Sequence, residues 1–139
     1  SGRGSFARAG ASHASTHATE DLLERARLAH IAGERVANLA HGQQRQLEIG
    51  MALAGAPRLI LFDEPAAGLS PAERRELVAL LTSLPSHMSF VLIEHDLDIA
   101  LRVAERVTVM HNGRVLRTGA PDEIEGDAQV QAIYMGAKH

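Results

Sequence analysis

Two adjacent carboxylates, Asp63 and Glu64, follow the apolar run RLILF and precede a proline. A continuous apolar run of this length predicts a strand buried on both faces, and open α/β sheets bind ligands at the carboxyl ends of such strands. Successive side chains of an emerging strand point to opposite sides. Asp63 could therefore hold Mg²⁺ through water while Glu64 faces an attacking water molecule. Strands also end in acids for solubility alone, so the pair by itself leaves both interpretations open.

A histidine follows the next apolar run of the chain. His95 comes directly after SFVLIE, so we expect it at the same sheet edge as Glu64. A neutral imidazole there can donate a hydrogen bond to a γ-phosphate oxygen and orient the attacking water. A surface histidine is the alternative interpretation. The chain has eight histidines, and only its position in the pattern distinguishes His95 from the others.

A third cluster, LAHGQ at residues 39–43, lies directly before a predicted helix. Gly42 would let a phosphate approach the backbone, and the helix N-terminus supplies N–H donors and partial positive charge. The cluster could therefore bind an anion. Many helices begin near a glycine, however, so this pattern alone does not establish a site.

Two helices are predicted before the first strand. The first starts at Thr19 as its cap, and its apolar positions are Leu22, Leu23, Ala26 and Ala29. The second runs from near Gly42 to Gly55, and its predicted buried stripe is Leu47, Met51 and Ala54. Residues 1–19 are mostly Gly, Ala, Ser, Thr and His, so we expect a flexible segment with little helix.

The rest of the chain alternates strands and helices. Between RLILF and SFVLIE, Ser70 and Glu73 form a capping box around Pro71 and open a helix whose inward positions are Leu77, Leu80 and Leu81. Another helix follows His95, so the pattern predicts a right-handed βαβ unit and an α/β fold with a mostly parallel sheet. The Asn112-Gly113 pair predicts an antiparallel hairpin with a type I′ turn beside that sheet, followed by short helices near residues 121–125 and 127–134.

The composition excludes several classes of protein. With 139 residues, 45% of them hydrophobic and 22% charged, the chain should form one globular domain. A net charge of −3 and the absence of a Lys/Arg block argue against a nucleic-acid partner. The chain has no cysteine, which suits a reducing compartment such as the cytosol. No apolar run reaches the roughly 18 residues that cross a bilayer, so we expect no direct membrane insertion.

The order of these clusters resembles the nucleotide-binding subunits of ABC transporters. LAHGQ is similar to their signature loop, LILFDEP to the Walker B strand, AAGLSP to the D-loop and IEHD to the switch-histidine segment. GQQRQLEI, DEPAAGLSP and LRTGAPDEI most resemble the ATPase subunits of branched-chain amino-acid importers. The resemblance implies the C-terminal half of such a subunit, with a partial P-loop NTPase fold. Residues 1–19 would be a flexible segment, 20–56 part of the helical signature subdomain and 57–139 the C-terminal part of the RecA-like ATPase core.

The resemblance also implies roles for the matching residues. Asp63 would bind Mg²⁺ through water, Glu64 would be the catalytic base and His95 would contact the γ-phosphate of ATP. The residues implied at the ATP of an opposite subunit or across the dimer interface are Leu39, Ala40, His41, Gly42, Gln43, Gly68, Leu69 and Ser70. The implied partners are a second ATPase subunit, identical or different, and transmembrane permease subunits. They would hold a cytoplasmic protein at the inner face of the cell membrane.

Two departures from the family pattern limit what this chain can do alone. Ala40 stands where the family usually has serine, so a donor to a charged group, worth about 1.5–3 kcal/mol, is missing. No G-x-x-x-x-G-K-[ST] loop occurs, and the only lysine is Lys138, so the sequence contains no phosphate-cradling loop of that kind. We therefore predict that the isolated chain binds ATP negligibly and does not hydrolyse it.

Two alternatives stay open. ABC-type ATPases of DNA repair or chromosome maintenance share these motifs, but they insert long coiled coils, and no heptads are present here. A non-catalytic interaction module is the other alternative, against which the intact Glu64 and His95 argue. Because a partial sheet exposes edges and apolar faces, we also expect the isolated chain to self-associate.

Overall fold

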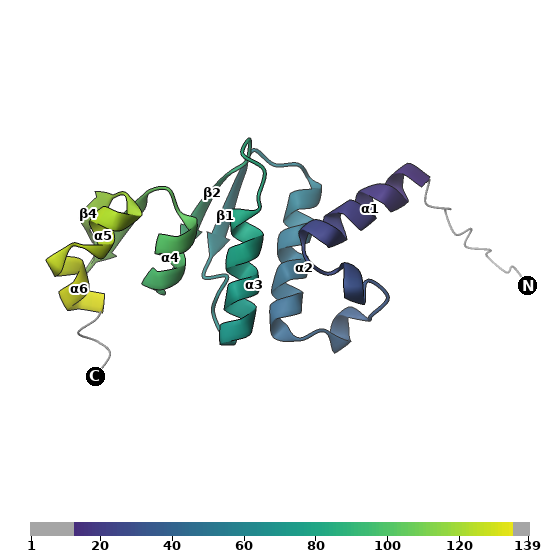
Figure 1. The fold of residues 1–139 in the computed structure, drawn as a ribbon, viewed down its shortest axis with the longest axis horizontal. Helices are drawn as coiled ribbons and strands as arrows, with labels where there is room; N and C mark the ends of the chain where they lie inside the picture. The colour runs from purple at the N-terminus through teal and green to yellow at the C-terminus, as the bar shows by residue number, and fades with distance from the viewer. Residues whose placement is uncertain (1–12, 135–139) are drawn as a thin grey trace, which may run out of the picture.

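The computed structural model describes residues 13–134, and it arranges them as an elongated α/β structure with α1 and α6 at opposite ends (Figure 1). The chain runs through α1 (His13–Arg25), two short 3-10 helices (Ala29–Ile31 and Val36–Asn38), α2 (His41–Ala54), β1 (Leu59–Asp63), α3 (Pro71–Thr82), β2 (Ser89–Ile93), α4 (Leu97–Val103), β3 (Val107–His111), β4 (Arg114–Gly119), α5 (Pro121–Glu125) and α6 (Ala128–Tyr134). None of the helices in this described part is long and apolar enough to cross a membrane.

The first helix begins earlier than the sequence predicted. α1 starts at His13, so Thr19 lies inside the helix and is not its cap. No glycine or proline interrupts residues 13–25, and the helix can therefore extend toward the N-terminus. The expectation of little helix is thus wrong for residues 13–19, and residues 1–12 lie outside the described range.

Helix α2 has the predicted bounds but buries a different face. Its buried positions are Gly42, Gln46, Ile49, Gly50 and Leu53. The predicted stripe is wrong, because Met51 is 69% exposed and Ala54 is also exposed. Two of the buried positions are glycines, and a Cβ at Gly50 would lie only 3.0 Å from the Cβ of Ala26. The absence of a side chain at Gly50 lets Ala26, the residue after α1, pack closely against this face, and a search for apolar side chains misses that signal.

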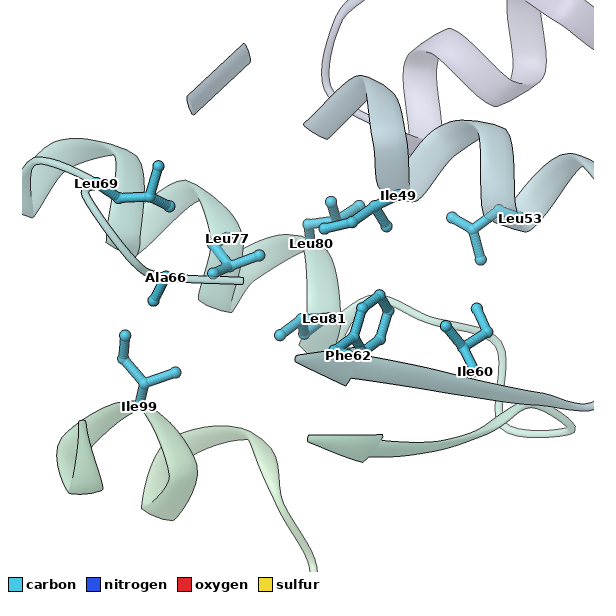
Figure 2. Packing of buried hydrophobic residues seen from close by; sticks show 10 residues of the cluster. All are labelled: Ile49, Leu53, Ile60, Phe62, Ala66, Leu69, Leu77, Leu80, Leu81 and Ile99. Atoms are coloured by element: carbon cyan, nitrogen blue, oxygen red, sulfur yellow. The ribbon is translucent and has the colours of Figure 1, made fainter. Parts of the chain in front are cut away.

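The βαβ unit is present at the centre of the molecule. β1 and β2 pair in parallel with the register Leu59↔Ser89 to Asp63↔Ile93. Figure 2 shows Ile60 and Phe62 of β1 pointing toward α2 and α3, where Ile49, Leu53 and Leu80 meet them. The predicted inward positions of α3 are confirmed, because Leu77 is 1% exposed, Leu80 0% and Leu81 2%.

The other face of this sheet is uncovered by the described elements. Leu59 is 55% exposed, Leu61 72%, Val91 50% and Ile93 60%. The prediction that both strands are buried on both faces is therefore wrong here, because helices pack against only one side. These four side chains form the apolar surface that self-association would use, and self-association stays a prediction.

The predicted hairpin is also present, in a sheet of its own. β3 and β4 pair antiparallel from Val107↔Gly119 to His111↔Arg114, with an irregularity between Val109 and Met110. The two turn residues Asn112 and Gly113 have φ values of 49° and 74°, as a type I′ turn requires. In the described range this hairpin has no ladder to β1 and β2. Its core is a separate cluster of Val107, Val109, Ile124 and Val130.

Candidate functional site

Glu64 and His95 meet at the carboxyl end of the parallel strands. The Nδ1 atom of His95 lies 3.4 Å from Oε1 of Glu64, and the two side chains are 69% and 50% exposed. Each follows one of the paired strands, so their proximity results from the register of β1 and β2. The sequence predicted this convergence, and the geometry agrees. Both groups remain open to solvent, which a phosphate or water molecule needs in order to reach them.

The backbone at this edge is held in an unusual conformation. Glu64 has a φ of 45°, the left-handed region that a residue with a side chain rarely adopts and that costs roughly 1–3 kcal/mol. Its N–H donates to the carbonyl oxygen of Ile93 at 2.9 Å and so links the turn after β1 to the end of β2. The strained turn therefore directs the Glu64 side chain while the ladder keeps it beside β2.

Residues on either side of His95 anchor the second strand end. The N–H of Ala66 donates to Oε1 of Glu94 at 2.8 Å, while Oε2 of Glu94 is buried without a partner. Asp96 accepts from the guanidinium of Arg74 and from the N–H of Ile99, which caps α4. Glu94 and Arg74 were not predicted from the sequence as supporting residues. Both lie within or beside the motifs, but only the fold shows which groups they contact.

Asp63 is exposed at the last position of β1. The described residues contain no group of three or more His, Asp or Glu side chains placed to hold a metal ion. Mg²⁺ keeps several waters and usually takes one or two protein carboxylates together with substrate phosphates. Asp63 therefore fits a Mg²⁺ ion that arrives with a nucleotide, and the described residues do not fit an all-protein Mg²⁺ site.

The LAHGQ loop (residues 39–43) leads into α2 with Ala40 as its N-cap. The N–H of Ala40 donates to Oε1 of Gln43 at 2.9 Å. The N–H of Gly42 donates to Oε1 of Glu73 at 2.8 Å. The N–H of Gly42, which was predicted to bind a phosphate, thus donates to a carboxylate from α3. Gly42 is also buried. The predicted open anion site is therefore not present at Gly42 in this structure.

The GLS loop (residues 68–70) lies beside the LAHGQ loop. Gly68 has a φ of 74°, and a Cβ there would stand 3.4 Å from Nε2 of His41. Leu69 is only 6% exposed and belongs to the main core. Its neighbours in this chain enclose the Leu69 side chain, and a place for Leu69 at a dimer interface stays a prediction. Ser70 caps α3 as predicted, with its Oγ accepting from the N–H of Glu73 at 3.3 Å.

Glu73 is charged at neutral pH. The backbone N–H of Ser70 lowers the pKa of this carboxyl most, followed by the Ser70 hydroxyl, the N–H of Gly42 and the nearby His41. Each of these groups favours the ionised form. The carboxylate also borders a groove of about 1030 Å³, whose lining includes Arg27, Ala40 and Glu76. No residue that lines this groove belongs to the Glu64 and His95 edge.

Comparison with known proteins identifies the family. The model of the ABC transporter family matches residues 4–67. The ADP conformation of MJ1267, an ATP-binding cassette of an ABC transporter, superposes with a TM-score of 0.76 at 30% identity, over 90% of this chain and 51% of that one. The cbiO1 protein from Clostridium perfringens gives a TM-score of 0.75 at 25% identity, over 90% and 50% of the two chains. The chain belongs to the ABC transporter family of ATPases, and its predicted α/β fold with a parallel sheet is confirmed.

Several curated relatives are ATP-binding proteins of amino-acid transport. The branched-chain amino-acid transport ATP-binding protein LivG of Escherichia coli is 38% identical over 116 residues, which are 82% of this chain and 46% of LivG. LivG of Salmonella typhimurium is 39% identical over the same length. The lipopolysaccharide export ATP-binding protein LptB of Acidithiobacillus ferridurans is 37% identical over 118 residues, 84% of this chain and 49% of LptB. The chain spans about half the length of these relatives.

Proposed function

We propose that this chain is the C-terminal portion of the ATP-hydrolysing subunit of an ABC importer for branched-chain amino acids. The observation that carries the proposal is the 3.4 Å approach of His95 to Glu64 at the end of the parallel strands. Nothing in the core requires a carboxylate and an imidazole at these two exposed positions, whereas ATP hydrolysis can use both. The LivG relatives support the choice of substrate.

In the proposed reaction Glu64 orients the attacking water and accepts its proton. At 3.4 Å the contact with His95 is longer than a strong hydrogen bond, so the Glu64 oxygens remain able to bind water. Nε2 of His95, the ring atom away from that contact, would donate to a γ-phosphate oxygen. Asp63 would hold a Mg²⁺ ion through water, and the ion would supply charge neutralisation to the nucleotide phosphates.

The remaining parts of the ATP site lie outside this chain in the proposal. The sequence has no G-x-x-x-x-G-K-[ST] loop, so the γ-phosphate must be cradled by another segment. The LAHGQ loop and the GLS loop would serve ATP at the contact with a second ATPase subunit. Permease subunits would convert the ATP-driven closure of the two subunits into transport at the inner face of the membrane.

A chimera tests this proposal. Residues 20–139 would replace the matching part of Escherichia coli LivG, and ATP hydrolysis would be measured beside that of the 139-residue chain alone. We expect turnover from the chimera, because LivG supplies the missing half, and neither binding nor turnover from the isolated chain. A folded chimera that binds ATP without hydrolysing it would contradict the proposed role, and micromolar ATP affinity of the isolated chain would contradict the missing-loop argument.

A second candidate function is an ATPase for lipopolysaccharide export. The 37% identity to LptB is close to the 39% identity to LivG, and the Glu64 and His95 geometry suits both. Two chimeras, one with each relative, separate the candidates in cells that lack LivG or LptB. Restored uptake of labelled leucine without restored lipopolysaccharide export supports the importer, and the reverse result supports the exporter.

A further inference from the structure

One carboxylate contacts two loops that lie far apart in the sequence. Oε1 of Glu73 accepts from the N–H of Gly42 at 2.8 Å, across 31 residues. Oε2 of the same side chain accepts from the N–H of Ser70 at 2.8 Å. Gly42 belongs to the LAHGQ loop and Ser70 to the GLS loop. The side chain therefore bridges the N-terminal ends of α2 and α3.

At α2, the bridge supplies a hydrogen-bond acceptor that the N-terminus of the helix lacks. The first N–H groups of a helix have no partner within it and are usually served by an N-cap side chain. Ala40 occupies the N-cap of α2 and makes no side-chain cap hydrogen bond. Glu73 reaches over from α3 and satisfies the N–H of Gly42 in its place. The contact is thus a long-range substitute for a local cap.

The absence of a side chain at Gly42 leaves room for the Glu73 carboxylate. A Cβ at position 42 would lie 2.5 Å from Oε1 of Glu73, well inside van der Waals contact. Within a helix glycine is less favourable than alanine, so its presence at the second position of α2 needs a reason. Room for the Glu73 carboxylate is a sufficient one. From the sequence, the same glycine was predicted to let a phosphate approach the backbone.

The GLS loop is held from other sides as well. His41 stands next to Gly68, and Nε of Arg74 donates to the carbonyl oxygen of Leu69 at 3.2 Å. Arg74 also pairs with Asp96, the residue after His95. The first turn of α3 therefore contacts the LAHGQ loop through Glu73 and the His95 segment through Arg74.

We propose that Glu73 is a positioning residue that fixes the LAHGQ loop against the GLS loop through paired hydrogen bonds to Gly42 and Ser70. Its relevance to ATP hydrolysis rests on the proposed function, which places both loops at the contact with a second subunit. With the bridge intact the two loops move as one unit.

A double-mutant cycle between Gly42 and Glu73 tests the bridge in the 139-residue chain. With Glu73 in place, G42A should lower the Tm, because the new Cβ collides with the carboxylate. In the E73A background the collision is gone and alanine is the better helix former, so G42A should raise the Tm. The same Tm change from G42A in both backgrounds would overturn the proposal. If the G42A chain does not fold, folding of the G42A/E73A chain supports the bridge and failure of both overturns it.

Amide hydrogen exchange at Gly42 gives a second test. If Glu73 only capped α3, its removal would leave the exchange rate of the Gly42 amide unchanged. E73A removes both acceptor oxygens and should speed exchange at Gly42 as well as at Ser70, by about tenfold for a lost hydrogen bond to a charged group. E76A, the same substitution one turn along α3, is the matched control and should leave the Gly42 amide unchanged. Faster exchange at Ser70 alone would show that Glu73 serves only its own helix and would overturn the proposal. Neither experiment needs nucleotide, so the bridge and the proposed ATPase function can fail independently.

Discussion

The two functional regions of this chain differ in how their polar groups are satisfied. At the strand ends Glu64 and His95 are half or more exposed and touch each other at 3.4 Å. At the loop pair, Glu73 accepts the N–H groups of Gly42 and Ser70 and leaves Gly42 buried. The strand ends thus leave two polar groups open to solvent, whereas the loops are held by the protein itself. We infer that the first region performs chemistry and that the second sets geometry.

The largest expected effect tests the first half of this comparison. In the LivG chimera, E64Q should reduce ATP turnover by about 10²–10³-fold, because the amide cannot accept a proton from water. The Tm should not change, since the side chain is exposed and outside the core. E105Q, at another exposed glutamate, is the control and should retain turnover. Equal activity of E64Q and E105Q would remove Glu64 from the reaction.

A smaller loss is expected at the other partner of the strand-end pair. H95A should lower turnover by about 10–100-fold, the equivalent of one lost hydrogen bond to a charged group. The imidazole is 69% exposed, so chemical denaturation should show a change in stability of less than about 0.5 kcal/mol. A drop in stability that matches the drop in turnover would show that His95 acts on the fold and not on the substrate.

The loop region should show the opposite pattern, with a stability effect that needs no ATP. S70A removes the side-chain cap of α3 and should cost about 1 kcal/mol of unfolding free energy. Urea denaturation measures this, with S86A at an exposed loop serine as the control. If S70A and S86A denature at the same urea concentration, the capping hydrogen bond contributes nothing.

The smallest effect concerns the pH dependence of the Glu73 bridge. The Ser70 N–H, the Ser70 hydroxyl and the Gly42 N–H lower the pKa of Glu73 in the folded chain. A lowered folded pKa means that the bridge contributes above the unfolded pKa and is lost as the pH falls through the folded pKa. The other titratable or charged residues that border the same groove are Glu24, Arg25, Arg27, His30 and Glu76.

An NMR titration of the Gly42 amide checks this dependence. The amide shift should titrate with a midpoint below that of glutamate in an unstructured peptide, and E73Q should abolish the transition. A midpoint at or above the peptide value would contradict the stabilisation of the carboxylate by its neighbours.

Local signals predicted much of the fold. Ser70, Pro71 and Glu73 opened α3 as expected, and Asn112-Gly113 formed the expected turn. These features depend on residues within a few positions of one another, which a single sequence contains. The proximity of Glu64 and His95 was predicted for a different reason, because two strand ends in a βαβ unit share an edge.

Long-range packing was predicted less well. The buried face of α2 was misplaced because Gly42 and Gly50 leave room on it for Glu73 and Ala26, and glycines leave no apolar pattern. The exposed Leu61 of β1 was expected to be buried, since an apolar run cannot show whether a second layer is present. The Glu73 bridge spans 31 residues, and the capping box that revealed Glu73 gave no sign of its second partner.

The measurement that tests the central claim most directly is a kinetic double-mutant cycle of E64Q and H95A in the LivG chimera. When two residues act as a unit on one water and one phosphate, the rate losses of the single substitutions do not add in the double variant. We predict that the double variant hydrolyses ATP about as slowly as E64Q alone. A double variant whose loss equals the product of the two single losses would show that Glu64 and His95 act independently, and it would contradict a shared catalytic site at the strand ends.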